Sequence, residues 1–154
     1  MTPLFKKLNF KESEYILVMN APDSFEKELA GIASFTKIQK DANEVSSIDF
    51  VMVFALKQEQ IDTAIAQIVA KLNGDAIVWF CYPKGTSKRY TCDFNRDTGW
   101  AVLGKNNLEP VRQVAIDEDW SALRFRKTEY IKTLTRSRAI SAEGKERIKK
   151  TKSE

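Results

Sequence analysis

Polar and basic side chains follow three apolar runs of the sequence, and their types are suited to binding a ligand. The stretch Asn20–Ser24 follows the first run and Lys57 follows the second, while Tyr82 ends the third and Lys84 lies two residues beyond it. Helix N-terminal amides together with basic side chains suit an anion such as phosphate or carboxylate. The candidate ligand-binding residues are Asn20, Asp23, Ser24, Lys57, Tyr82 and Lys84. The alternative is that Pro22 and Asp23 only begin and cap a helix, and that the lysines are solvated.

The residue types that the sequence lacks exclude several kinds of site. There is no histidine, which removes Ser-His-Asp and Cys-His triads and imidazole metal ligands. Cys81 and Cys92 form no C-x-x-C motif, so they predict no zinc site, and we expect both to be free thiols. Asp117 and Asp119 have a spacing that could hold a divalent cation, although two carboxylates in a short link are typical of a turn. We therefore predict no catalytic residue, no metal and no cofactor.

The central part of the sequence predicts a strand, a helix and a second strand. Apolar residues recur three or four positions apart from Ile61 to Leu72, and Gly74 follows as a stop signal. Near-continuous apolar runs flank this helix at 48–56 and 76–82. Runs of this kind, rich in Val, Ile and aromatic residues, are typical of parallel strands that are buried on both faces. We expect a βαβ unit with a right-handed crossover.

The segment before this unit predicts a similar arrangement. A strand is expected at 15–20, and Asp23 and Glu26 have the spacing of a capping box that begins a helix over about 24–31. The alternating residues 34–40 are typical of an exposed edge strand.

The segment after residue 83 predicts a different arrangement. Asp93 is expected to cap a helix over about 94–105, and residues 110–117 and 121–127 to form an antiparallel hairpin. Residues 128–135 are compatible with another helix. The predicted class is therefore α/β, a Rossmann-like open three-layer sheet of about six strands. Most strands are parallel, with the first, third and fourth in the middle and the hairpin at one edge.

Charge and hydropathy divide the 154 residues into a body and a tail. The formal net charge is +4, and residues 136–154 hold seven Lys or Arg and three Glu. We predict one α/β domain at 1–135 and a mobile, basic tail at 136–154. No apolar run is long enough for a membrane span or a signal peptide, so a cytoplasmic location is expected.

The layout resembles the Rossmann-like fold of methyltransferases that use S-adenosylmethionine, which also close with an antiparallel hairpin. The stretch "SSIDFVMVFALKQEQIDTAIAQIVAKLNGDAIVWFCYPKG" looks like the fourth strand, helix and fifth strand of that family. The family carries a glycine-rich loop after its first strand, where this chain has "MNAPDSF". In that family an acidic residue at the end of the second strand binds the ribose. Asp41 lies only approximately at that position in this sequence. The resemblance thus implies the fold and leaves the activity open.

A narrower resemblance is to short, uncharacterised bacterial proteins that are catalogued as a domain of unknown function. It is carried by four segments spread over residues 15–127: Asn20–Pro22, Trp79–Lys84, Asp97–Trp100 and Val114–Phe125. It implies a shared fold and brings no activity with it.

Three functional hypotheses remain open at this point. The first is a non-catalytic binding or interaction module for a small anionic ligand or a protein partner, because the glycine loop and histidine are missing. The second is a divergent methyltransferase-like enzyme, on the strength of the layout. The third, nucleic-acid association through the tail, has weak support, because three glutamates dilute the tail's positive charge. We expect the first, with neither nucleic acid nor membrane as a partner.

Overall fold

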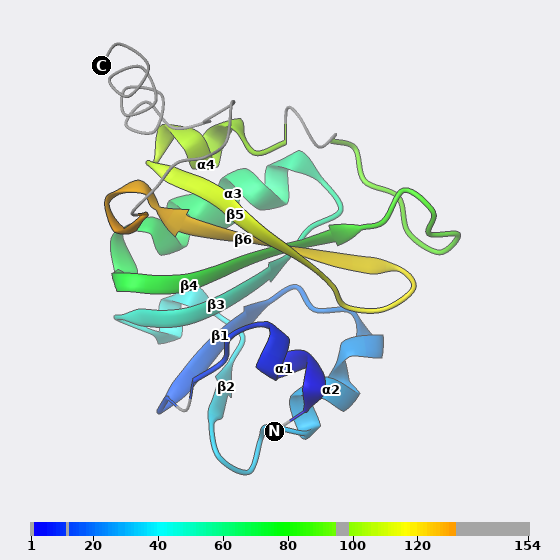
Figure 1. Cartoon of the computed structure of the whole chain (residues 1–154), viewed down its shortest axis with the longest axis horizontal. Helices are drawn as coiled ribbons and strands as arrows, with labels where there is room; N and C mark the ends of the chain where they lie inside the picture. The colour runs from blue at the N-terminus through cyan, green and yellow to red at the C-terminus, as the bar shows by residue number, and fades with distance from the viewer. Residues whose placement is uncertain (1, 12, 95–98, 132–154) are drawn as a thin grey trace.

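The protein is built on one mixed six-stranded sheet. The computed structural model describes residues 2–11, 13–94 and 99–131. The strand order is β2-β1-β3-β4-β6-β5 (Figure 1). The strands are β1 (Tyr15–Met19), β2 (Lys37–Gln39), β3 (Ile48–Phe54), β4 (Leu72–Pro83), β5 (Leu108–Ala115) and β6 (Trp120–Lys127). The first four are parallel, and β6 pairs antiparallel with both β4 and β5. The predicted Rossmann-like α/β class is confirmed, with β1, β3 and β4 inside the sheet and the hairpin at one edge.

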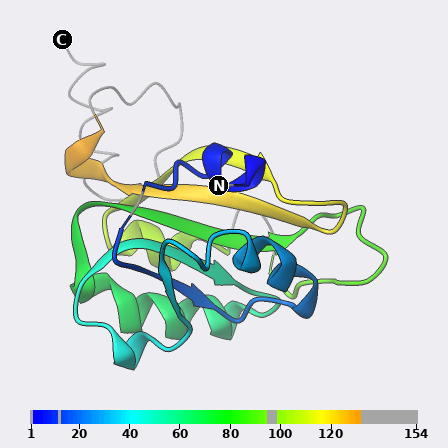
Figure 2. The same ribbon diagram turned by 90° about the horizontal axis from the view of Figure 1, so that it is seen from below.

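Short helices and turns connect these strands. The helices are α1 (Pro3–Lys7), α2 (Glu26–Ala30), α3 (Gln58–Ile68) and α4 (Ala101–Lys105). The 3₁₀ turns are η1 (Asp23–Phe25), η2 (Ala42–Glu44), η3 (Val69–Lys71) and η4 (Thr128–Tyr130). The side view places α1 and α3 on opposite sides of the sheet (Figure 2). The helix α3 buries the stripe expected from its sequence, namely Ile61, Ala64, Ile65 and Ile68.

Two apolar layers hold the sheet between its helices. On one face, α3 and α4 pack against strand residues such as Val51 and Phe80. On the other, α1 and α2 pack against residues such as Met52 and Trp79. Because β1, β3 and β4 are covered on both faces, nearly all of their residues must be apolar, which explains their near-continuous hydrophobic runs. Trp79 also donates its indole N–H to the carbonyl of Leu8 at 2.9 Å, which ties the segment after α1 to the sheet.

The N-terminal helix α1 was not expected from the sequence. It has five residues, too few to show a hydrophobic period. Its start signals are nevertheless present, since Thr2 caps it through a 3.2 Å bond from the Phe5 amide and Pro3 opens it. Phe5 is fully buried among the aromatic rings beneath the helix, and this burial holds α1 on the sheet.

Several expected boundaries and caps were wrong. The edge strand expected at 34–40 is formed only by Lys37–Gln39. The expected capping box of Asp23 and Glu26 does not form; Glu26 instead pairs with Lys40 at 3.2 Å. The helix expected at 94–105 is present over Ala101–Lys105, and residues 95–98 lie outside the described residues.

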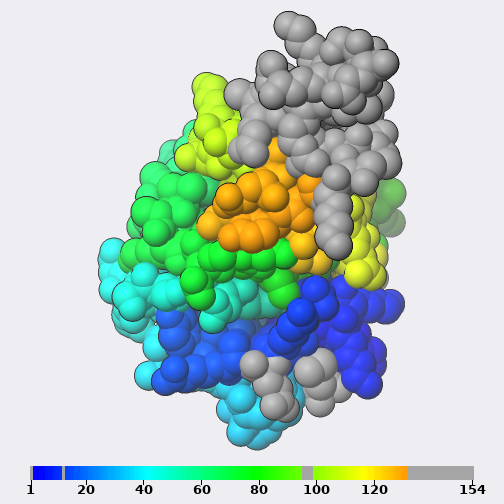
Figure 3. Space-filling view, turned by 60° about the vertical axis from the view of Figure 1, so that its left-hand side comes forward, coloured from blue at the N-terminus to red at the C-terminus, as the bar shows by residue number. Residues whose placement is uncertain are grey.

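Thr128–Tyr130 form a turn, where a helix was compatible with the sequence. The turn η4 lies against the start of β4 in the space-filling view (Figure 3). The remaining residues of the 128–135 segment from 132 on, and the predicted tail at 136–154, lie outside the described residues. Cys81 and Cys92 are free, as expected. None of the helices in the described ranges has the length and apolar character needed to cross a bilayer.

Candidate functional site

A cavity of about 380 Å³ lies at the carboxyl edge of the parallel strands. Four segments form it: the loop after β1, the loop between β3 and α3, the loop after β4, and the start of β6. Its lining consists of Asn20, Ala21, Pro22, Asp23, Ser24, Phe54, Ala55, Leu56, Gln60, Arg89, Tyr90 and Trp120. Ligands of open α/β sheets gather at this edge, so its position matches the site expected from the topology.

Asn20 gives the loop after β1 the backbone conformation that a glycine would otherwise supply. Its φ angle is 61°, in the left-handed region. Asparagine tolerates this region better than other residues with a β-carbon. The chain can therefore turn sharply at the end of β1 without glycine, and the loop continues through Pro22 into η1.

Three aromatic rings form one wall of the cavity. Trp120 lies at the centre, with ring-centroid distances of 5.2 Å to Phe54 and 5.1 Å to Tyr90. Trp120 is 2% exposed, so its packing fixes the wall in one position. Aromatic faces attract planar groups and cations, so the wall can bind a ligand group of either kind.

The polar side chains of the lining carry both signs of charge. Asp23 is its carboxylate and Arg89 its guanidinium. The Arg89 guanidinium carbon lies 5.7 Å from the centre of the Tyr90 ring, which is the distance of a cation–π contact. Gln60 has a structural task, since its side-chain oxygen accepts the amide protons of Leu56 and Lys57 at 2.7 Å and 3.1 Å.

The loop after β4 is fixed against the β5–β6 turn, and this contact places Arg89 and Tyr90. The Ser87 hydroxyl donates to Asp119 Oδ1 at 2.8 Å and accepts from the Tyr90 amide at 3.1 Å. The Lys84 amide donates to the Asp119 carbonyl at 2.8 Å. Two strand ends are thereby held together on one side of the cavity.

Asp117 and Asp119 act within the turn. Asp117 Oδ1 accepts the amide protons of Asp119 and Trp120, both at 2.8 Å. This pattern is that of an Asx turn. It also sets the position at which Trp120 enters the aromatic wall. Among the described residues there is no cluster of three or more carboxylates or thiols that could hold a metal ion.

The six candidate residues from the sequence fall into two groups. Asn20, Asp23 and Ser24 line the cavity, whereas Lys57, Tyr82 and Lys84 do not. Their role in binding a ligand stays a prediction.

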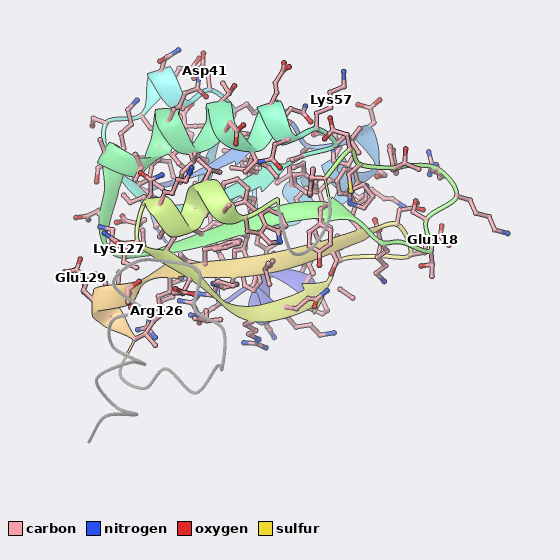
Figure 4. All side chains as sticks on the ribbon, turned by 90° about the horizontal axis from the view of Figure 1, so that it is seen from above. Asp41, Lys57, Glu118, Arg126, Lys127 and Glu129 are labelled. Carbon is pink, nitrogen blue, oxygen red and sulfur yellow. The ribbon has the colours of Figure 1, made fainter. Side chains whose placement is uncertain are left out.

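Lys57 and Tyr82, two of the candidates that do not line the cavity, have contacts elsewhere in the fold. Lys57 is exposed at the start of α3, at the same end of the molecule as Glu118 of the β5–β6 turn (Figure 4). Tyr82 packs against Trp100 at 5.5 Å and accepts a 3.0 Å bond from Gln113. Tyr82 thus belongs to the opposite face of the sheet, because neighbouring strand residues alternate between faces.

Asp41 also lies outside the cavity lining. Its carboxylate caps η2 by accepting the Asn43 amide at 2.9 Å. The strand before it pairs with the start of β1, as in Lys37 opposite Tyr15, and so does not reach the carboxyl edge.

Phe54, Gln60 and Trp120 line the cavity and were absent from the candidate set. Phe54 ends an apolar strand and looked like ordinary core, while Trp120 is brought in by the hairpin turn. The end of β3 is the signal that could have identified Phe54, because the carboxyl ends of neighbouring parallel strands share one edge. No local pattern in the sequence places Trp120 there.

A second hollow of about 310 Å³ lies near the opposite end of the sheet. It is lined by Val69, Leu72, Asn106, Asn107, Leu108, Lys127, Thr128 and Glu129. Lys127 and Glu129 lie far from Lys57 and Glu118 in the view from above (Figure 4). Of these two hollows, the carboxyl-edge cavity is the one that combines an aromatic wall with charges of both signs.

Comparison with known proteins connects this fold to methyltransferases. No protein-family model matches the sequence, and no curated protein matches it. The pyocyanin biosynthetic protein PhzM aligns with a TM-score of 0.54 and 9% identity, over 80% of this chain and 53% of that one. This chain therefore spans about half the length of PhzM.

Two further solved structures are methyltransferases by their descriptions. N-methyltransferase NodS from Bradyrhizobium japonicum WM9, in complex with S-adenosyl-L-homocysteine, aligns with a TM-score of 0.50 and 19% identity. That alignment covers 80% of this chain and 83% of NodS. A SAM-dependent methyltransferase from Aquifex aeolicus aligns with a TM-score of 0.51 and 8% identity, over 80% of this chain and 87% of that one. At these identities the likeness shows the fold.

These neighbours correct our functional expectation. The expectation of a non-catalytic binding module was wrong, as was the leaning against an enzyme, because solved structures that share the fold are methyltransferases. The physical reason for the error lies at Asn20. The missing glycine was interpreted as the loss of a nucleotide loop, although Asn20 adopts a left-handed backbone conformation of the kind that glycine allows.

Proposed function

We propose that this chain is a divergent methyltransferase-like enzyme that binds S-adenosylmethionine at the carboxyl-edge cavity. The observation that carries the proposal is the position of this cavity in a fold shared with methyltransferases. It lies directly beyond the ends of β1 and β3, and the loop after β1 forms one side of it. Because fold alone does not define activity, the residues of the cavity must also fit the cofactor.

The donor set of the cavity fits the chemical groups of S-adenosylmethionine. Its volume of about 380 Å³ is within the range of small-molecule sites. The cofactor's sulfonium is a cation that an aromatic wall such as Trp120 and Tyr90 can attract. Its carboxylate suits the Arg89 guanidinium, and its ammonium or ribose hydroxyls suit the Asp23 carboxylate.

The chemistry supplied by bound S-adenosylmethionine is an electrophilic methyl group carried on a sulfonium. The protein's part is to orient the acceptor and exclude water. The sequence has no histidine, and Asp23, the carboxylate among the lining residues, is assigned to the cofactor, so the lining supplies no separate carboxylate or imidazole as a general base.

Calorimetric titration with S-adenosylmethionine and S-adenosylhomocysteine tests the proposal. We expect both to bind, and we expect Arg89→Gln and Asp23→Asn each to weaken binding at least tenfold. Lys105→Gln is the control, because Lys105 is exposed on α4 across the sheet from the cavity. Absence of binding at millimolar concentration would remove the proposal. If the Arg89 variant, the Asp23 variant and the control bound S-adenosylmethionine with equal affinity, the carboxyl-edge cavity would be ruled out as the binding site.

The finer expectations about origin and location belong to this proposal. We propose that the chain is related to the short bacterial proteins that share the Asn20–Pro22 and Trp79–Lys84 segments, and that the enzyme works in the cytoplasm. Detection of the native protein in bacterial cell fractions tests the location.

A further inference from the structure

Two residues outside the lining of the carboxyl-edge cavity, Ser87 and Asp119, connect residues that belong to it. Ser87 lies in the loop after β4, and Asp119 lies in the β5–β6 turn directly before Trp120. The Ser87 hydroxyl donates to Asp119 Oδ1 at 2.8 Å. The same hydroxyl oxygen accepts the amide protons of Arg89 at 3.3 Å and Tyr90 at 3.1 Å. We call the pair of Ser87 and Asp119 the loop–turn bridge.

The loop–turn bridge joins the two sides of the aromatic wall. Figures 1 and 2 show the loop after β4 and the β5–β6 turn at the same end of the sheet. Tyr90 belongs to the loop and Trp120 follows the turn, and their ring centroids are 5.1 Å apart. The Arg89 guanidinium lies over the Tyr90 ring. The bridge therefore holds three lining residues that come from two separate connections of the fold.

The β5–β6 turn does not need the Asp119 carboxylate for its own shape. Asp117 Oδ1 accepts the amides of Asp119 and Trp120, and the Trp120 carbonyl accepts the amides of Ile116 and Asp117. Asp119 is nevertheless only 8% exposed, and within the described residues it makes no ion pair. A buried carboxylate requires a hydrogen-bond donor, and the Ser87 hydroxyl is one. The loop, and not the turn, therefore accounts for this side chain.

The start of the loop is also attached without the bridge. The Lys84 amide donates to the Asp119 carbonyl at 2.8 Å, and the Ser87 amide donates to the Lys84 carbonyl at 3.0 Å. An alanine at position 87 would keep both of these backbone bonds. What the Ser87 hydroxyl adds is its hold on the amides of Arg89 and Tyr90, which are the lining residues of this loop.

We infer that Ser87 and Asp119 are positioning residues for the cofactor of the carboxyl-edge cavity. The inference rests on the proposed function, in which Arg89 and Tyr90 contact S-adenosylmethionine. The bridge residues act through those two side chains, because they hold the loop at a fixed distance from Trp120. A loop that is already held in its binding geometry loses less conformational freedom when the ligand binds, so the affinity is higher.

Calorimetric titration of the full chain with S-adenosylhomocysteine tests the inference. We expect Ser87→Ala and Asp119→Ala each to weaken binding about fivefold, which corresponds to one hydrogen bond. Ser87→Thr keeps a hydroxyl and Asp119→Asn keeps an oxygen acceptor, so both should bind within about twofold of the wild type. Ser34→Ala is the matched control and should leave the affinity unchanged, because Ser34 is exposed and does not line the cavity.

Near-ultraviolet circular dichroism of the ligand-free variants gives a second measurement. This signal depends on fixed packing of aromatic rings, to which the Tyr90–Trp120 pair contributes. We expect the signal to decrease in the two alanine variants and to be retained in Ser87→Thr and Asp119→Asn. Identical spectra in all four variants would show that the bridge does not position the rings, and would overturn the inference.

The binding results separate this inference from the proposed function. Wild-type affinity in both alanine variants would overturn the inference and leave the proposed function intact. Equal losses in the alanine variants and the conservative variants would also overturn it, because the hydrogen bond would not be the cause. Absence of binding to the wild type would remove the proposed function, and this inference with it.

Discussion

At the scale of single residues, Asn20 decides whether the loop after β1 can serve a ligand. A φ of 61° is accessible to glycine and asparagine and is strained for most other residues. Asn20 therefore allows a sharp turn after β1 and also places a side chain in the cavity lining. The prediction from the sequence considered only small residues such as glycine for this turn.

Replacement of Asn20 measures how much the loop depends on this conformation. Asn20→Ala should lower the free energy of unfolding by about 1 kcal/mol, because alanine gains no local hydrogen bond in the left-handed region. Asn20→Gly should be nearly neutral or slightly stabilising. Urea unfolding of the two variants and the wild type gives the comparison. An alanine variant as stable as the glycine variant would show that the loop adopts another conformation.

Cys81 gives the stability of the protein a pH dependence at its alkaline limit. Complete burial raises the pKa of the Cys81 thiol well above its usual value of 9.0. Well below pH 9.0 the thiol is protonated in both states, and its contribution to stability is fully present. Above that pH the unfolded chain loses the proton and the native state keeps it, so stability falls as pH rises.

A comparison of the wild type with Cys81→Ala isolates this effect. Between pH 8 and pH 10.5 the wild type should lose more stability than the variant, at a limiting slope of about 1.4 kcal/mol per pH unit. The cavity created by alanine lowers the free energy of unfolding by the same amount at every pH. A difference in slope between the two proteins therefore reports the thiol alone. Urea unfolding across this pH range provides the measurement, and parallel curves for the two proteins would contradict the account.

At the scale of elements, α3 is capped by a residue from a distant loop. The amide of Gln58 donates to Asp93 Oδ1 at 2.7 Å, and the Asp93 amide donates to the Leu56 carbonyl at 3.0 Å. The sequence predicted that Asp93 caps the helix that follows it. The observed contact instead joins the loop after β4 to the start of α3, next to the cavity.

Substitution of Asp93 tests this cap. Asp93→Ala should lower the free energy of unfolding by about 1 kcal/mol, within the usual range for a lost N-terminal cap. Asp93→Asn keeps an oxygen acceptor and should retain most of the stability. Thermal unfolding of both variants distinguishes them. If alanine and asparagine had equal effects, the cap would not be the source of the stabilisation.

Elements with a strong period were predictable from the sequence, and elements defined by long-range contacts were not. The stripe from Ile61 to Ile68 predicted α3, and the apolar runs predicted β3 and β4, because burial on one face or two imposes those patterns. The five-residue α1 is too short to show a period. Trp120 reached the cavity through the hairpin turn, a tertiary contact that its neighbours in the sequence do not encode.

At the scale of the whole molecule, the sheet brings the loops together at one edge. Asn20, Leu56 and Tyr90 come from three separate connections, and all of them line the same cavity. The strand order of the whole sheet, and no single loop, therefore forms this cavity.

Chemical-shift mapping of backbone amides with S-adenosylhomocysteine tests the central claim most directly. We predict shifts concentrated at residues 20–24, 54–56 and 89–90, with the amides of α4 unchanged. Shifts that are absent at millimolar ligand, or that gather away from these three segments, would contradict the assignment of the carboxyl-edge cavity as a cofactor site.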